Sequence, residues 1–115
     1  MKKINIIKKN EEFARIIKNN NPYKNNSYII YIENTIQNYY HFGISVSKKI
    51  GNAVVRNKIK RQIKCIIDKK DYKKDVNCII IVRKNFLNNS FNYNERMLLE
   101  VFEKNKIFKE ETNEK

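Results

Sequence analysis

Residues 45–61 decide the fold, and they read SVSKKIGNAVVRNKIKR. They begin inside a period-two alternation of apolar and polar side chains that predicts a strand over residues 40–47. Gly51 and Asn52 then predict a turn, in which glycine supplies a permissive backbone. From residue 53 to residue 69, apolar side chains recur at helical spacing and indicate a long amphipathic helix. A strand, a turn and a basic helix are therefore expected at the centre of the chain.

The same stretch carries a concentrated positive charge. The chain has 25 Lys and Arg residues against 12 Asp and Glu, which gives a formal net charge of +13. No acidic residue occurs in residues 34–67, although seven cations fall within residues 48–64. Such a field attracts polyanions over about one Debye length, and the backbone N–H groups that open a helix add donors for phosphate. A polyanionic partner is therefore expected at this segment.

Two further helices are expected on either side of the centre. Asn10 can act as the N-cap of the first, and residues 19–22 (NNNP) end it. The last helix is expected at residues 93–104, with Asn92 as its cap. Both helices carry apolar side chains at a spacing of three and four residues, so each is expected to pack one face against the core.

Two further strands complete the pattern, at residues 27–33 and at residues 76–83. The connection at residues 34–38 suits a hairpin between the first two strands. The element order predicts an α+β protein, an α/β sandwich with helices around one mostly antiparallel sheet. Residues 1–109 are expected to form a single domain, and residues 110–115 a polar, mobile tail.

The length of the apolar runs excludes a membrane span, and the number of cysteines excludes a usual zinc site. The longest apolar run, residues 79–82, is far shorter than the ~20 residues of a membrane span, and no export signal is expected. Cys65 and Cys78 are too few ligands for a usual structural zinc site. They are expected to be free thiols, as in a cytoplasmic protein.

No catalytic or metal-binding residues are expected in this chain. A metal-dependent nuclease needs converging carboxylates, and the basic segment has none. His41 has no evident acidic or basic partner, and Ser45 and Ser47 have no neighbouring base that would make them nucleophiles. The chain is therefore expected to assist chemistry that another molecule performs.

Residues 48–61 (KKIGNAVVRNKIKR) closely resemble the signature of the bacterial ribonuclease P protein subunit. The similarity extends to residues 8–13 (KKNEEF), residues 42–47 (FGISVS) and residues 79–84 (IIIVRK), and covers about residues 5–109. The resemblance implies a protein that joins a large catalytic RNA, which removes the 5′ leader of precursor tRNA with magnesium ions held mainly by the RNA. It also implies an unusual left-handed βαβ crossover, shared with a domain of the small ribosomal subunit. No protein partner and no membrane are implied.

The resemblance further assigns two groups of site residues. The residues expected to face the catalytic RNA are Lys48, Lys49, Asn52, Arg56, Asn57, Lys58 and Arg61. The resemblance also implies a cleft for the single-stranded leader between the first helix and the sheet face, and the matching residues are Phe13, Ile29, Tyr31, Ser45, Lys60 and Lys64. Aromatic platforms beside a cationic track are also what single-stranded RNA requires on physical grounds. From helical spacing alone, Phe13 could equally be a core residue or an aromatic platform for RNA.

Two positions depart from the family pattern. Lys58 stands where the family has arginine, so a phosphate contact is kept but the planar bidentate fork is lost. Ile17 stands where a second aromatic residue is common on the first helix, which removes one stacking surface.

Two other functions stay open at this point. A general RNA-binding or ribosomal protein would share the charge and the fold, and would bind RNA without affecting cleavage. A membrane-surface protein would lay the basic helix on anionic lipid, although the core needs the apolar stripe of that helix. Binding measurements with and without a cleavage readout separate these functions.

Overall fold

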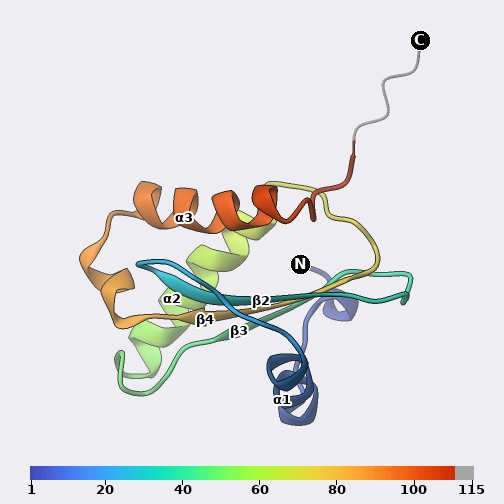
Figure 1. The fold of residues 1–115 in the computed structure, drawn as a ribbon. Helices are drawn as coiled ribbons and strands as arrows, with labels where there is room; N and C mark the ends of the chain where they lie inside the picture. The colour runs from blue at the N-terminus through green and yellow to red at the C-terminus, as the bar shows by residue number, and fades with distance from the viewer. Residues whose placement is uncertain (111–115) are drawn as a thin grey trace.

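A computed structural model describes residues 1–110 of the chain, and the end of the expected tail, from residue 111 on, lies outside them. Three helices pack on a four-stranded mixed sheet (Figure 1). The helices are α1 (Asn10–Asn19), α2 (Ala53–Ile67) and α3 (Phe91–Lys104). The strands are β1 (Tyr23–Lys24), β2 (Tyr28–Asn34), β3 (His41–Ser45) and β4 (Val76–Val82), and two 3₁₀ turns are η1 (Lys3–Asn5) and η2 (Lys84–Asn88). The α+β class and the central strand–turn–helix segment are as the sequence predicts.

The strand order is β1-β2-β4-β3, which places β4 inside the sheet. β4 pairs antiparallel with β2 and parallel with β3, so that Ile79 has Tyr31 on one side and Gly43 on the other. The expected hairpin between β2 and β3 is therefore wrong, because β4 lies between them. The physical reason is that β4 is apolar at nearly every position, and the central place buries both of its faces.

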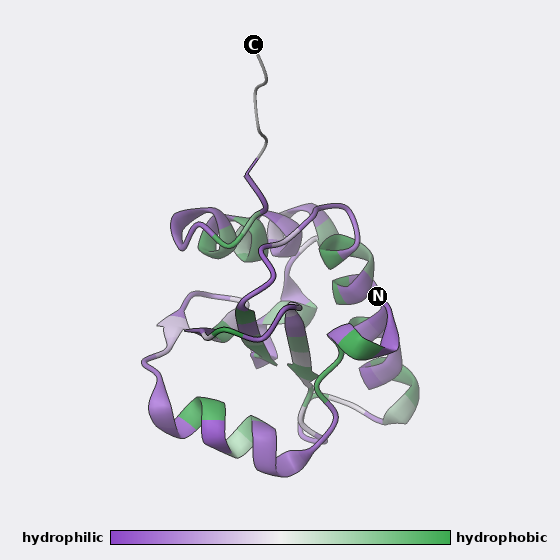
Figure 2. Ribbon diagram, turned by 90° about the vertical axis from the view of Figure 1, so that its right-hand side faces the viewer, coloured by the Kyte–Doolittle hydropathy of each residue, from purple (hydrophilic) through white to green (hydrophobic). Residues whose placement is uncertain are grey.

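Helix α2 makes the connection between the parallel strands β3 and β4, as parallel pairing requires. It lies with α3 on one face of the sheet, whereas α1 lies on the opposite face (Figure 1). The expected apolar stripe of α2 is confirmed, since Ile59, Ile63, Ile66 and Ile67 are all buried. Figure 2 shows the resulting alternation of apolar and polar residues along the helices.

The main core fills the space between the sheet and the pair α2 and α3. Its aromatic centre brings Phe42 of β3 within 4.8 Å of Tyr72 and 5.7 Å of Phe102, measured between ring centroids. These distances and the steep angles between the rings are those of favourable edge-to-face pairs. A smaller cluster of Ile7, Ile16 and Ile79 holds α1 against the other face.

The two outer helices begin at other residues than the sequence suggests. Asn10 is the first residue of α1 and does not cap it, because the N-cap position is taken by Lys9 without a side-chain hydrogen bond. α3 begins two residues earlier than expected, and Ser90 caps it by accepting a hydrogen bond from the N–H of Tyr93 at 3.1 Å. Asn92 is therefore inside α3, which corrects its predicted role as a cap.

Candidate nucleic-acid interface

The turn between β3 and α2 is held by its own side chains. Asn52 caps α2 by accepting a hydrogen bond from the N–H of Val55 at 3.0 Å. The guanidinium of Arg56 donates from Nη1 to the carbonyl oxygen of Gly51 at 2.9 Å. Two residues predicted to face RNA therefore also fix the shape of the turn, although a guanidinium keeps further N–H donors for a ligand.

Gly51 is required because the chain passes close to Val55 there, and not because its backbone takes a positive φ. No glycine in the described residues has a positive φ, which corrects the expectation of a permissive turn at this position. A Cβ on Gly51 would lie 2.8 Å from Cγ1 and 2.9 Å from Cβ of Val55. The glycine therefore lets the incoming loop lie directly against the first turn of α2.

The outward side of α2 presents the remaining predicted RNA-facing residues. We name Asn57, Lys58 and Arg61 the outer arc, and all three are exposed, as are Lys48 and Lys49 in the preceding loop. None of these cations forms a salt bridge with any of residues 1–110. Because no acidic residue occupies the first turn of α2, the outer arc carries uncompensated positive charge.

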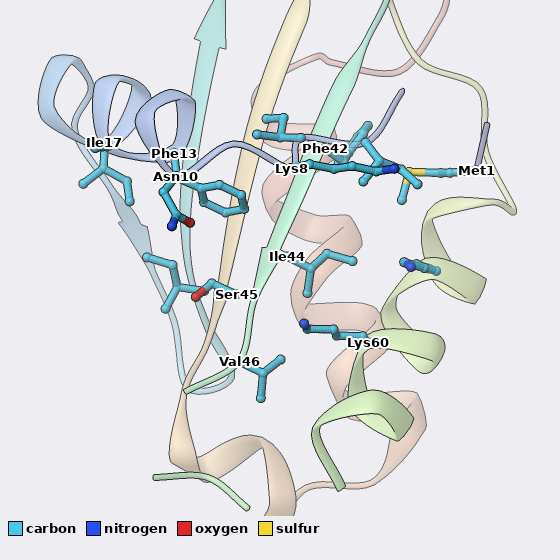
Figure 3. Close-up of a pocket in the computed structure, with 15 residues that line it drawn as sticks. Met1, Lys8, Asn10, Phe13, Ile17, Phe42, Ile44, Ser45, Val46 and Lys60 are labelled. Carbon is cyan, nitrogen blue, oxygen red and sulfur yellow. The ribbon is translucent and has the colours of Figure 1, made fainter. Parts of the chain in front are cut away.

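A cleft of about 650 Å³ lies between α1 and α2, with β3 between them (Figure 3). Four of the six residues predicted for a leader cleft line it: Phe13 from α1, Ser45 from β3, and Lys60 and Lys64 from α2. The close-up shows Lys60 extending from α2 toward the opening, across from Ser45 and Phe13. The cleft thus combines an aromatic wall with a cationic wall.

Phe13 both packs against the core and lines the cleft. Its ring lies on the backbone of Gly43, where a Cβ would be only 2.6 Å from the ring atom Cζ. It packs against the smaller cluster that holds α1, and it also lines the cleft, with its side chain half-buried. Gly43 therefore sets how closely α1 approaches β3.

Ile29 and Tyr31 do not line this cleft. Both belong to β2, which is separated from β3 by β4, and both are half-buried. Tyr31 packs against the smaller cluster under α1. The structure thus brings together four of the predicted cleft residues and places these two beyond β4.

Sequence reasoning missed Lys8 and Asn10 as residues of the cleft. Both are exposed and line it beside Ile44 of β3. The N–H of Ile7 donates to the carbonyl oxygen of Phe42 at 2.9 Å, which aligns the N-terminal segment with β3 and brings Lys8 to the opening. The available signal was the basic pair just before the first helix, but only the bridge to β3 reveals its position.

A polar network fixes α1 to the sheet beside the cleft. Arg15 of α1 donates two hydrogen bonds to the carboxylate of Glu33, at 3.1 and 3.2 Å. Asn77 of β4 donates to the same carboxylate at 2.9 Å, and Asn20 does so at 3.2 Å. Burial acts to raise the pKa of Glu33, but the hydrogen bonds from Asn77, Arg15 and Asn20 together outweigh it and lower that pKa. The carboxylate is therefore stabilised as the anion that holds α1.

His41 has an acidic neighbour that the sequence did not reveal. Its Nδ1 lies 3.3 Å from Oε2 of Glu12 in α1 and has no hydrogen-bond partner among the described residues. Nowhere in residues 1–110, this pair included, do three His, Cys, Asp or Glu side chains gather closely enough to hold a metal ion. The same residues contain no helix with the length and apolarity of a membrane span.

Comparisons with known proteins agree with this arrangement. A family model described as Ribonuclease P matches residues 1–106. The ribonuclease P protein component of Mesoplasma florum is 42% identical over 103 residues, covering 85% of this chain and 92% of the relative. That of Mycoplasma mycoides is 50% identical over 92 residues, covering 76% and 83%. A solved structure of the Staphylococcus aureus RNase P protein, a mutant with defective mRNA degradation activity, has a TM-score of 0.83 at 35% identity and covers 92% of both chains. The chain therefore belongs to the ribonuclease P protein family, the protein components of an endoribonuclease of tRNA processing.

Proposed function

We propose that this chain docks on the catalytic RNA of ribonuclease P through the outer arc and the β3–α2 turn, and binds the 5′ leader of precursor tRNA in the cleft between α1 and α2. The catalytic RNA, with magnesium ions that it mainly holds itself, then cleaves the leader from the tRNA. The observation that carries this proposal is the position of α2, which directs Lys60 and Lys64 into the cleft and Asn57 and Arg61 away from it. One helix thereby offers cations to two RNA surfaces.

The cleft has the chemistry that a flexible single strand needs. Phe13 supplies an aromatic surface, and Lys60 and Lys64 supply charge for phosphates on the facing wall. Stacking of a base on an aromatic ring contributes about 1–3 kcal/mol and tolerates any base. Such a site recognises an unpaired strand with little sequence preference, which suits the leaders of many different precursor tRNAs.

The core position of α2 argues against a role on a membrane surface. Its apolar residues Ile59, Ile63 and Ile66 are 3% exposed or less, so they are not available to lipid. A general RNA-binding protein remains the competing function, and it differs in having no effect on cleavage.

Reconstitution tests the proposal. The purified chain is added to a transcribed bacterial ribonuclease P RNA at low magnesium, and 5′-matured tRNA is measured. Stimulated cleavage supports the proposal, whereas RNA binding without stimulated cleavage would leave only the general RNA-binding function.

Two pairs of substitutions separate the two surfaces. Replacing Lys60 and Lys64 together by Ala is expected to weaken binding of leader-bearing tRNA but not of mature tRNA. Replacing Asn57 and Arg61 together by Ala is expected to weaken assembly with the catalytic RNA instead. Arg56 is left in place, because its bond to Gly51 fixes the turn and its loss would alter the local fold. Equal losses for both substrates in the lysine pair would refute the leader site.

A matched control uses two lysines that belong to neither surface. Lys104 and Lys106 are exposed near the end of α3, and replacing both by Ala removes the same amount of charge. This control is expected to bind leader-bearing tRNA nearly as well as the unmodified chain. If it weakens binding as much as the Lys60 and Lys64 pair does, only the total charge of the protein matters.

A further inference from the structure

A second, smaller groove lies on the flank of α2 that faces away from the cleft. Its volume is about 300 Å³, and it separates α2 from η2 and the start of α3. Val55, Phe86, Leu87 and Phe91 form apolar walls, and Lys58 and Gln62 of α2 stand among them. The groove is therefore mainly apolar, with Lys58 and Gln62 on the α2 side and Asn89 and Asn94 on the other.

Two exposed apolar side chains line this groove, and a third, Val54, lies on α2 next to its lining residue Val55. Leu87 is 50% exposed and Phe91 is 37% exposed, and Val54, one helical turn before Lys58, is 76% exposed. These are three of only six large apolar side chains that are exposed among residues 1–110. Leu87 and Phe91 line the groove itself, and Nζ of Lys69 lies 5.5 Å from the centroid of the Phe91 ring, so exposed apolar surface and positive charge meet there.

The wall opposite α2 is fixed before any ligand arrives. Asn94 is 2% exposed, and its Nδ2 donates to the carbonyl oxygen of Phe86 at 3.0 Å. Its own carbonyl oxygen accepts from the hydroxyl of Tyr28 at 2.8 Å, and its Oδ1 accepts from Ser27 Oγ at 2.7 Å. These buried hydrogen bonds join η2, α3 and β2. The wall is therefore ordered before a ligand binds, and binding does not have to order it at a cost in entropy.

The polar groups on the α2 side select the class of ligand. No carboxylate lines the groove, and Lys58 belongs both to the groove and to the outer arc. The side-chain amide of Gln62 has no hydrogen-bond partner within the described part of the chain, and it can both donate to and accept from the edge of a planar ligand. A volume at the lower end of the range for small-molecule pockets fits one aromatic ring system and not a peptide helix.

We propose that this groove receives a single unpaired nucleobase of the RNA that docks on the outer arc. The inference rests on the proposed function, because it takes the catalytic RNA as the source of the base. Lys58 binds the phosphate beside that base, Phe91 and Leu87 contact its faces, and Gln62 contacts its edge. A second copy of this chain is a poorer occupant, since two molecules of formal charge +13 repel each other.

The test measures binding of the chain to a transcribed bacterial ribonuclease P RNA, together with nucleotide-resolution chemical probing of that RNA. Phe91→Ala is expected to weaken binding by about 5- to 150-fold, the range for the loss of one stacked base. Leu87→Ala is a second variant, with a smaller loss. Ile36→Ala is the matched control, because Ile36 is 95% exposed in the connection between β2 and β3. Circular dichroism confirms that each variant is folded.

Probing shows where any effect arises. The unmodified chain is expected to protect one unpaired nucleotide that Phe91→Ala and Leu87→Ala leave reactive, while protection from the outer arc stays in both. Unchanged affinity and an unchanged footprint in Phe91→Ala would overturn the inference but leave the proposed function intact. So would a dimer of the unmodified chain that Phe91→Ala converts to a monomer, since it would assign the groove to a second copy. Failure of the unmodified chain to bind the RNA would overturn both.

Discussion

Replacing Gly43 by Ala tests how the cleft between α1 and α2, the proposed leader site, is built. A Cβ at this position would lie 2.6 Å from Cζ and 2.9 Å from Cε1 of Phe13, and 3.0 Å from Cδ1 of Ile79. Since ordinary contact begins near 3.4 Å, the ring of Phe13 must retreat by about 0.8 Å, which displaces the aromatic wall of the cleft. Overpacking of this kind destabilises the fold by about 1–3 kcal/mol. Replacing a glycine within a strand by alanine stabilises it by about 0.5–1 kcal/mol. Taking the middle of each range, we expect Gly43→Ala to lower the free energy of unfolding by about 1 kcal/mol.

Urea unfolding followed by circular dichroism measures this change, and binding assays measure its consequence for the cleft. Leader-bearing tRNA is expected to bind Gly43→Ala less tightly, whereas assembly with the catalytic RNA is unaffected, because the outer arc lies on the other side of α2. Adding Phe13→Leu should relieve the clash. The double variant should then lose less free energy of unfolding than the sum of the losses of the two single variants, by about 0.5 kcal/mol or more. A Gly43→Ala protein as stable as the original, or more stable, would refute the close contact.

Three other predictions concern α1, α3 and the charge of the cleft. Glu33→Gln is expected to lower the free energy of unfolding by about 1–3 kcal/mol at pH 7, since it weakens a partly buried network. Because the pKa of Glu33 is lowered in the folded state, its contribution is complete above the unfolded pKa of about 4.3 and is lost as pH falls through the folded pKa. In urea titrations, the difference in free energy of unfolding between the original protein and Glu33→Gln should therefore be smaller at pH 3 than at pH 7. An equal difference at both pH values would contradict the role given to the Glu33 carboxylate. Ser90→Ala is expected to cost about 1 kcal/mol in thermal unfolding, and Asn92→Ala at most about 0.5 kcal/mol, with the reverse order excluding Ser90 as the cap. The binding constant for leader-bearing tRNA can be measured over a range of salt concentrations. Replacing Lys60 and Lys64 by Ala should make the plot of its logarithm against log[salt] less steep by about 1.4, and an unchanged slope would mean that neither lysine contacts phosphate.

The elements with strong local patterns were predictable from the sequence. The apolar stripe of α2 and the continuous apolar run of β4 allow few other structures, and both are confirmed within two residues. The partner of each strand was not predictable in the same way. Strands next to each other in sequence often form hairpins, but nothing in residues 34–38 reveals that β4 separates β2 from β3. That arrangement depends on which strand buries most surface in the finished fold.

The candidate site was predictable in its residue types and only partly in its geometry. Lys60 and Lys64 lie in one cleft with Phe13 because helical spacing and the fold agree there. Lys8 joins them only through a backbone bridge to β3, which no local pattern encodes. Tyr31 has a suitable ring for stacking and packs under α1, but its strand lies beyond β4, so it does not line the cleft between α1 and α2, and its role in leader binding stays a prediction.

The rigidity of α2 has a geometric consequence for the assembled enzyme. An α-helix with its side chains is about 10–12 Å across, and its buried stripe prevents α2 from rotating on the sheet. If the leader and the catalytic RNA bind on opposite flanks of α2 as proposed, the helix holds them at a fixed distance from each other. A substitution in the hidden side of α2 would shift both strands together, and so would change the alignment of the scissile bond without touching either RNA.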